Sequence, residues 1–496
     1  MKDNLYIESS REKLMDGITK AADVVSKTIG TSGSNVLIEC LERPHHFSTN
    51  DGATILGAMK FSDPLEEMGR QIVFEAVSRA NKASGDGSST TAVLTAKIMQ
   101  EGMSVVKDIP PMEIKRQLEA CIPLIEKSLK EQRREITIDE VAMVASVSAE
   151  DESVGKMIQE IYQKIGAKGI INWDISKTPE DSYTINKGIA IPDATYVTSY
   201  MCDEGMNEAR LSDAPVLLVK DKITSALEFE ALFKDMFNAG HRQLAMFCEE
   251  IDVPVISDLL QTQRIRGFRT VVIKMPVLWR DEWWEDLQVA SGAKLISRAS
   301  GNPLSKATIQ SLGAFEHITV KREETVIEGM QDMNKHIMVL AAEGSDASLV
   351  RAARLNTMTA RYFVGAHSET ALAYRRLKCE DAINAASCAL ENGVVVGGGI
   401  ALLNASEELP NEILKYALKA PFRAILDNAD CEVDMESEVG GFMGFNSRTK
   451  KVEDLVKAGI VDPYDVVLGA VKSAIGVAAS VLTTQAIILL NKDAVG

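Results

Sequence analysis

The sequence is poor in basic residues and in paired cysteines. It has 54 lysine and arginine residues against 71 aspartate and glutamate residues, for a net charge of −17. This balance argues against binding that depends on neutralising a phosphate backbone, so we expect no nucleic-acid partner. The seven cysteines are scattered, and no CxxC pair occurs. Neither a disulfide framework nor a zinc site is therefore encoded, and a reducing, cytoplasmic location is expected.

Long hydrophobic runs are also missing. The first residues, MKDNLYIESSREKL, contain early acids and lack the apolar core of a secretory signal. The longest uncharged stretch, Ser473–Leu490, is interrupted by several hydroxyl residues and by Gln485. This pattern predicts a buried helix followed by a strand, and no membrane partner.

Two common nucleotide-binding motifs are absent. No GxxxxGK[ST] segment occurs, which disfavours a standard P-loop NTPase. The contiguous glycines Gly397, Gly398 and Gly399 do not fit the GxGxxG spacing of a dinucleotide fold.

What the sequence does contain is enough for a large globular protein with several cores. Its 496 residues suggest about three domains, and 46% apolar with 25% charged residues is an ordinary globular composition. Helical periodicity dominates both ends of the chain, for example over Arg11–Thr28 and Tyr464–Leu482. In the middle, short β-branched runs such as Pro215–Asp221 and Arg269–Met275 alternate with amphipathic helices. We therefore predict a multidomain α/β protein in which an α/β domain is inserted into a mainly helical one.

Three glycine-rich segments are candidates for a phosphate site. TIGTSGSN (Thr28–Asn35) can aim backbone N–H groups into one concavity, although a helix end followed by a turn explains it equally simply. GDGSSTT (Gly85–Thr91) offers a carboxylate, bare N–H donors and hydroxyls at a helix start, or only an N-cap. GVVVGGG from Gly393 permits close backbone approach to a ligand, or serves loop packing.

Two acids complete this set. Asp51 lies in an NDG turn, and Asp381 lies on a helix expected over Ser368–Glu391. From spacing alone, Asp381 is indistinguishable from a solvated surface acid.

The order of these motifs resembles the group I (bacterial-type, 60 kDa) chaperonins over nearly the whole chain. The resemblance rests on KTIGTSGSNV, STNDGATI, KASGDGSSTTAVLTAKI, ASVSAEDESVGKMI, KCEDAINAASCALENGVVVGGGIALL and GIVDPYDVVLGAVKSA. It implies an equatorial ATPase domain at 1–131 and 392–496, an intermediate hinge domain at 132–187 and 360–391, and an apical client-binding and lid-binding domain at 188–359.

The resemblance also implies roles for single residues, with ATP and Mg²⁺ as ligands and K⁺ as a further candidate cation. Asp381 would be the hydrolytic acid, Asp51 would help to orient water, and Asp86 would ligate magnesium. The implied ATP-binding residues are Thr28, Ile29, Gly30, Gly33, Asn50, Gly87, Ser88, Ser89, Thr90, Gly398, Asn446, Ser447 and Asp462.

The same resemblance implies an apolar surface that captures unfolded clients or a cochaperonin lid. The matching residues are Tyr196, Tyr200, Met201, Leu232, Phe233, Met236, Phe237, Leu259 and Leu260, each of which could instead be ordinary core. The polar run Gln261–Arg264 departs from the family pattern, as does Asn50, where the family usually has lysine.

The expected function is ATP-dependent protein folding in a ring of identical subunits, inherited as heptameric and either single or double. The terminal runs Asn4–Glu8 and Ala486–Leu490 are expected to be strands that pair with neighbouring subunits. Two alternatives are a metal-dependent phosphotransferase and a ring that assembles but has lost efficient turnover.

Overall fold

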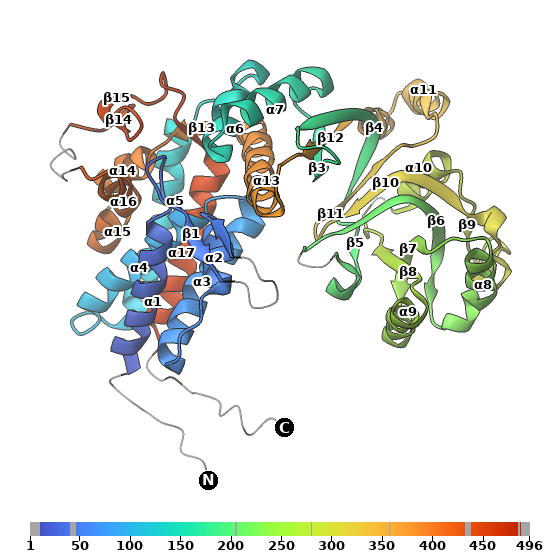
Figure 1. Cartoon of the computed structure of the whole chain (residues 1–496), viewed down its shortest axis with the longest axis horizontal. Coiled ribbons are helices and arrows are strands. Elements are labelled where there is room, and N and C mark those ends of the chain that lie inside the picture. The colour runs from blue at the N-terminus through green and yellow to red at the C-terminus, as the bar shows by residue number, and fades with distance from the viewer. Residues whose placement is uncertain are drawn as a thin grey trace, which may run out of the picture. The chain divides into compact units, whose positions relative to one another are not determined.

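The structure is a computed structural model that describes residues 10–39, 46–203, 206–278, 280–356, 358–431, 438–484 and 487. The chain divides into two compact units (Figure 1). Unit 1 comprises Met1–Ala167, Trp173–Ser182 and Phe363–Gly496, and unit 2 comprises Lys168–Asn172 and Tyr183–Tyr362. Both ends of the chain thus belong to the same unit.

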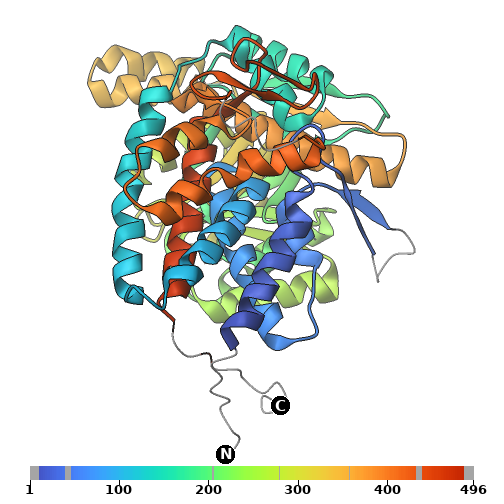
Figure 2. The same cartoon turned by 90° about the vertical axis from the view of Figure 1, so that its left-hand side faces the viewer.

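Unit 1 is built around long helices. Its largest helices are α1 (Ser10–Ser26), α3 (Pro64–Ser84), α4 (Ser88–Val105), α5 (Pro111–Gln132) and α17 (Tyr464–Leu482). Helix α17 packs against α3, α4 and α5, and Figure 2 shows it in red beside the cyan α5 and the blue N-terminal helices. The first and last parts of the chain therefore share one hydrophobic core.

Shorter elements surround this core. They are β1 (Val36–Ile38), β2 (Phe47–Thr49), α2 (Gly52–Ala58), η1 (Ile138–Glu140), α6 (Val141–Ala149), α7 (Glu152–Ile165), α13 (Glu369–Asn392), β13 (Val394–Val396), α14 (Ile400–Glu407), α15 (Glu412–Ala417), α16 (Ala420–Asn428), β14 (Met443–Asn446), β15 (Lys451–Asp454) and β16 (Val461–Pro463). Three small antiparallel pairs form among the strands: β1 with β2, β13 with β16, and β14 with β15.

Helix α17 is long and apolar enough to cross a membrane. Its burial accounts for this composition, because residues along the whole helix, from Val467 to Leu482, belong to the core of unit 1. The sequence prediction of a buried helix is therefore confirmed for Tyr464–Leu482. The strands expected at Asn4–Glu8 and Ala486–Leu490 lie outside the described residues, apart from Ile487.

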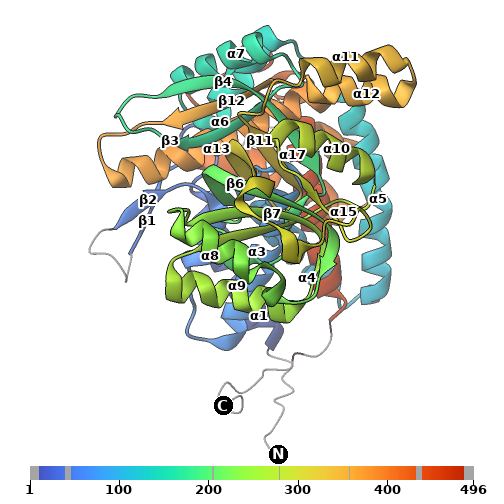
Figure 3. The same cartoon turned by 90° about the vertical axis from the view of Figure 1, so that its right-hand side faces the viewer.

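Unit 2 is a sheet covered by helices on both faces (Figure 3). The order is β3-β12-β4-β11-β10-β6-β7-β8-β5, and β9 pairs with β6. Strands β6, β7 and β8 are parallel, whereas β4, β11, β10 and β6 form antiparallel neighbours. The strands are β3 (Ile170–Ile175), β4 (Ser182–Pro192), β5 (Thr195–Tyr196), β6 (Ala209–Ile223), β7 (Gln243–Ile251), β8 (Arg269–Lys274), β9 (Leu295–Ile296), β10 (Gly313–Val320), β11 (Glu324–Glu328) and β12 (Met358–Val364).

The alternation of side chains along β6 gives unit 2 two cores. Val216 and Leu218 pack with α10 on one face, whereas Leu217 and Val219 pack with α8 and α9 on the other. The helices are η2 (Ser199–Met201), η3 (Ala226–Phe229), α8 (Glu230–Asn238), α9 (Val253–Arg266), α10 (Arg280–Ser291), η4 (Leu304–Lys306), η5 (Ile309–Ser311), α11 (Asn334–Glu343) and α12 (Asp346–Leu355).

Helices α15 and α16 are separate because Pro421 can begin a helix but cannot continue one. Strands β10 and β11 pair as a hairpin. The three-domain division stays a prediction: the chain forms two units, and most of the segments expected to form the hinge domain belong to unit 1.

Candidate functional site

A cavity of about 490 Å³ in unit 1 is lined by all three glycine-rich segments. The first segment contributes Ile29 and Gly30, the second contributes Asp86, Gly87 and Thr90, and the third contributes Gly398. Asn446, Ser447 and Asp462 also line it. Segments far apart in the sequence therefore meet at one concave site, which is the arrangement expected of a ligand site.

The Thr28–Asn35 segment is fastened to the other parts of the cavity wall by hydroxyl groups. Thr28 Oγ1 lies 3.0 Å from Ser89 Oγ, and Thr31 Oγ1 lies 2.6 Å from Ser447 Oγ. Gly33 is required by packing, because a Cβ there would lie 2.4 Å from the carbonyl oxygen of Thr28. The loop is therefore tightly folded back on itself beside the cavity.

The Gly85–Thr91 segment places the start of helix α4 at the cavity. Gly87 is the N-cap residue, with φ +91°, and no side chain caps the helix there. A Cβ at Gly87 would also lie 2.9 Å from Val466. Because the first N–H groups of α4 have no side-chain cap and the helix dipole is positive at this end, this wall of the cavity is suited to an anion.

Asp51 is held rigidly next to this helix start. As the N-cap of α2 it accepts hydrogen bonds from the Thr54 N–H at 2.8 Å and from the Thr54 hydroxyl at 2.6 Å. The Ser88 hydroxyl donates to Asp51 Oδ1 at 3.3 Å and accepts from the Gly52 N–H at 3.2 Å. Ser88 therefore does not point freely into the cavity; it joins α2 to α4.

Asp86 lies among several acids. Its carboxylate accepts from the Gly87 N–H at 2.6 Å and from the Ser148 hydroxyl at 3.1 Å. Burial raises the pKa of Asp86, and the nearby charge of Asp51 raises it further. Burial also raises the pKa of Asp381 well above its usual range, with Asp86 and Asp51 adding to the effect. Three carboxyl groups from separate elements are thus brought together.

Asp462 and Asn446 form another part of the cavity wall. Burial, with a contribution from Asp86, raises the pKa of Asp462 to about 7. Asn446 donates from Nδ2 to Glu453 at 2.6 Å and accepts from the backbone N–H of Arg448 at 2.9 Å. Near neutral pH, Asp462 is partly protonated, so its carboxyl group can donate as well as accept a hydrogen bond.

Asn50 is placed differently from the other predicted ATP-binding residues. Its amide donates to Glu150 Oε1 at 2.7 Å, and Lys378 Nζ lies 2.9 Å from the same oxygen. Lys378 in turn lowers the pKa of both Asp86 and Asp381 by its charge. Sequence analysis gave no role to Glu150, Lys378 or Ser148, although all three lie in segments that carry the family resemblance, because only the packing of the fold shows which side chains of those segments reach the site.

The predicted client surface in unit 2 is divided by burial. Met201, Leu232, Met236 and Leu259 are at most 3% exposed and belong to the core between the sheet and helices α8 and α9, so their assignment to an open surface is wrong in this structure. Tyr196, Phe233 and Leu260 are partly buried against the cores of unit 2. Tyr200 and Phe237 are exposed. The correction follows from helical geometry, because the apolar stripe of a surface helix faces its own core.

Other apolar side chains around α8 and α9 are about as exposed as Tyr200, which is 74% exposed. Leu227, Val253 and Ile265 are 78%, 73% and 71% exposed. They lie in η3 and at the two ends of α9, and they belong to no apolar stripe that could be recognised in the sequence. Only their exposure in the structure identifies them as surface residues.

Comparison with known proteins assigns this architecture. The family model described as the TCP-1/cpn60 chaperonin family matches residues 21–230 and 228–492. A crystal structure of the chaperonin gp146 from the bacteriophage EL 2 (Pseudomonas aeruginosa), in presence of ATP-BeFx, is similar with a TM-score of 0.70 and 18% identity, covering 98% of this chain and 99% of that one. A second crystal form of that protein has a TM-score of 0.64 at the same identity and coverage. These likenesses confirm the expected multidomain α/β chaperonin fold. The chain therefore belongs to the TCP-1/cpn60 chaperonin family.

Proposed function

We propose that unit 1 hydrolyses ATP in the cavity described above and that this turnover drives the capture and folding of non-native proteins. The observation that carries the proposal is that Asp51, bonded to Ser88 at the start of α4, and Asp86, bonded to the Gly87 N–H, lie beside an uncapped helix start, and that their charges act on Asp381. Acids that raise each other's pKa are costly to keep together, and such groups concentrate at functional sites. A triphosphate bound with a cation would supply the missing positive charge next to them.

The cavity walls suit the parts of ATP. The N–H groups at the start of α4, with Thr90, face the cavity as phosphate donors. Gly30 and Gly398, both with positive φ, allow the backbone to come close to the ligand. Asn446 and Asp462 provide hydrogen-bonding groups for the nucleoside.

The acids around the cavity fit a magnesium ion. In the described part of the chain, no group of three or more His, Cys, Asp or Glu side chains is placed to hold a metal by itself. Magnesium needs only one or two carboxylates, because substrate phosphates and water complete its shell. Asp86 would hold it, and when bound it would spread the charge that develops on the transferred phosphoryl group. K⁺ stays a further candidate cation.

Asp381 is the proposed acid that orients the attacking water. Its raised pKa makes it a stronger proton acceptor than an ordinary aspartate once it is ionised. Asp51, fixed as the N-cap of α2, would hold the same water from a second side. Phosphoryl transfer needs little covalent help from the protein, so these two acids and the N–H groups of α4 would act by orienting the reactants, beside the charge that the bound magnesium would supply.

The chaperonin part of the proposal rests on exposed apolar side chains in unit 2. Leu227, Val253, Ile265, Tyr200 and Phe237 give an unfolded polypeptide a surface that the native fold does not cover. A cochaperonin lid would compete for the same surface. Assembly into a heptameric ring of this chain, single or double, is also proposed, as is a cytoplasmic location, which the six free cysteines in the described residues suit.

The test combines ATP turnover with refolding. Purified full-length protein should release phosphate from ATP only when Mg²⁺ is present, and it should raise the yield of a chemically denatured client only when ATP is present. A phosphotransferase would instead move phosphate to a small acceptor and leave the yield of the client unchanged. A ring without efficient turnover would bind the client but release no phosphate. Either result would overturn the proposal.

A further inference from the structure

The exposed Tyr200 lies on a short turn that its neighbours anchor. Tyr200 is 74% exposed on η2, whereas the next residue, Met201, is 1% exposed and belongs to the core between the sheet and helices α8 and α9. The sulfur of Met201 accepts a hydrogen bond from the backbone N–H of Val272 on β8 at 3.3 Å. The hydroxyl of Thr198 caps the turn by accepting from the Tyr200 N–H. The turn therefore presents one aromatic ring to solvent on a backbone that is held from inside.

Three polar residues hold the end of this turn, and they are called here the Arg269 clasp: Arg269, Asp203 and Arg210. Arg269, the first residue of β8, donates from Nη2 to the Met201 carbonyl at 3.1 Å and from Nη1 to the Arg210 carbonyl at 3.2 Å. The same Nη2 lies 2.7 Å from Asp203 Oδ1, and Asp203 Oδ2 accepts from the Arg210 N–H at 2.8 Å. One guanidinium thus joins β8 to the end of η2 and to the start of β6.

The chemistry of the Arg269 clasp suits a positioning task. The side chains of Arg269 and Asp203 are 25% and 26% exposed, so the ion pair is partly shielded from water. A single ion pair at a surface contributes little to stability, but a planar guanidinium that bonds a carboxylate and two carbonyls fixes the direction of each partner. A lysine ammonium is a single point of charge on a flexible stem and cannot reproduce this fork.

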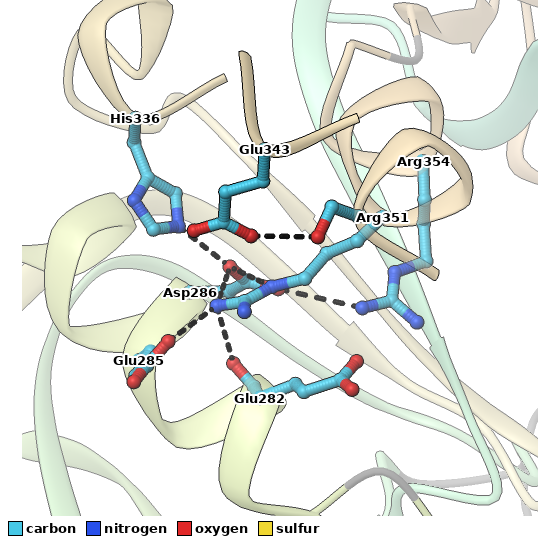
Figure 4. Close-up of polar contacts among 8 residues, drawn as sticks. Glu282, Glu285, Asp286, His336, Glu343, Arg351 and Arg354 are labelled. Atoms are coloured by element: carbon cyan, nitrogen blue, oxygen red, sulfur yellow. Dashed lines mark hydrogen bonds and ion pairs between the residues drawn. The ribbon is translucent and has the colours of Figure 1, made fainter. Parts of the chain in front are cut away.

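A second ionic cluster in unit 2 shows what distinguishes the Arg269 clasp (Figure 4). Asp286 on α10 is fully buried, and Arg351 of α12 and His336 of α11 contact it at 2.7 Å and 2.8 Å. Helices α11 and α12 also bury apolar side chains such as Leu355 in the core, so packing already holds them. Turn η2 has three residues and buries only Met201. Its position therefore depends more strongly on polar contacts.

We propose that Arg269 is a positioning residue for client capture, which holds Tyr200 in the geometry that binds an apolar segment of a non-native polypeptide. This inference rests on the proposed function and deepens it, because it names the group that prepares one of the exposed contact residues. An aromatic side chain on a fixed turn loses little further freedom on binding, so the entropic cost of capture is lower. Tyrosine suits this task, because it offers a large contact area with only two side-chain torsions.

The test measures the affinity of the full-length protein for a labelled globular protein that is kept unfolded by reduction and carboxymethylation of its cysteines. Arg269→Met removes all three contacts of the guanidinium and should weaken capture by about threefold to tenfold. Arg269→Lys can keep the ion pair with Asp203 and should restore part of the affinity. Arg280→Met is the matched control and should change nothing. The Arg280 side chain is 23% exposed and likewise contacts an acid, Glu249, and a backbone carbonyl, that of Pro276.

A double-mutant cycle with Tyr200→Ser separates positioning from general stability. If Arg269 acts through Tyr200, Arg269→Met should weaken capture in the parent and leave it nearly unchanged in the Tyr200→Ser protein. Equal weakening in both backgrounds would show that Arg269 supports the fold as a whole, and the inference would be wrong. If Arg269→Met does not fold, Asp203→Asn, which keeps the shape of the side chain, takes its place in the same cycle.

The outcomes also separate this inference from the proposed function. Unchanged capture by the Arg269→Met protein, or by the Tyr200→Ser protein, would overturn the role of Arg269. If Leu227→Ser combined with Ile265→Ser still loses affinity in that case, the proposed function stands. A parent protein that captures no unfolded client would overturn the proposed capture function and the role of Arg269 together.

Discussion

The two units of this chaperonin differ in how the charge of their buried carboxylates is balanced. In unit 2, Asp286 is fully buried, and Arg351, Arg354 and His336 surround it. In unit 1, the charges of Asp86 and Asp51 act on Asp381, and Lys378, whose charge opposes theirs, is already paired with Glu150.

The difference separates a structural cluster from a binding site. A carboxylate neutralised by arginines of its own fold needs nothing more, and its removal should damage the fold. Carboxylates left short of positive charge lower the stability of the fold until a ligand brings that charge. Changes to the two groups should therefore have opposite consequences.

The largest effect is expected for Asp381→Ala. Removing the acid that orients water should slow phosphate release by about 10²-fold or more, whereas ATP binding should stay within a few-fold of the parent. Binding of a fluorescent ATP analogue and steady-state phosphate release, measured on one preparation, give both quantities. Glu369→Ala, at the exposed start of the same helix, is the control. Equal phosphate release in variant and parent would remove Asp381 from its role.

Asp286→Ala in unit 2 is expected to lower the stability of the fold, whereas Asp381→Ala lowers catalytic activity. The change removes the buried partner of Arg351 and leaves it only Glu285, whose side chain is exposed, which should lower the free energy of unfolding of unit 2 by up to about 3–5 kcal/mol. Trp283 and Trp284, on the same helix, report the transition by fluorescence in urea. Asp281→Ala, on the exposed side of this helix, should change little. Unaltered stability of the Asp286→Ala variant would show that the contacts of Asp286 with α11 and α12 do not stabilise unit 2.

A smaller effect is expected on how the stability of the nucleotide-free protein depends on pH, through Asp462. Because burial raises its pKa in the folded state to about 7, the folded protein keeps a proton that the unfolded chain loses near pH 4. Stability should therefore fall as pH rises from about 4 to about 7 and then level off. The parent should lose about 2 kcal/mol of stability through Asp462 between pH 5 and pH 8, and the Asp462→Asn variant should not show this loss.

Melting temperatures at pH 5 and pH 8 without nucleotide measure this difference. Asp427→Asn, an exposed residue of α16, is the control and should keep the slope of the parent. If Asp462→Asn also keeps that slope, the raised pKa of Asp462 would be contradicted.

The smallest effect concerns the apolar surface around α8 and α9. Leu227→Ser combined with Ile265→Ser should weaken capture of a denatured client by about threefold to tenfold, because each residue contributes one partly covered side chain. Basal phosphate release should not change. A pull-down of labelled client at several concentrations gives the affinity. Unchanged capture would show that clients bind to another surface of the protein.

Much of the architecture could be read from the sequence because local signals agreed with the fold. Helix α3 begins at Pro64 after the Asp63 cap and ends before Gly85, which has φ +72°, as its end signals predict. The glycine segments were found because sharp turns and close approaches demand glycine. That they meet at one cavity was not derivable from spacing, and it entered only through family resemblance.

The features that could not be predicted from the sequence depend on packing between residues far apart in the chain. Glu150 and Lys378 are separated by 228 positions, and although both lie in segments that carry the family resemblance, only the fold shows that they pair. Met201, Leu232 and Leu259 were assigned to a surface by family resemblance, and their burial agrees with the alternative that they belong to the core. Asp286 could not be distinguished from a surface acid, because its partners lie on two later helices.

Electron microscopy of the purified full-length protein, without nucleotide, with ATP, and with ATP added to the Asp381→Ala variant, tests the central claim most directly. The account predicts closed rings in all three samples, a change of subunit shape when ATP is added to the parent, and accumulation of a single ATP-bound shape in the variant. Particles that never form rings, or rings of one shape whatever nucleotide is supplied, would contradict it.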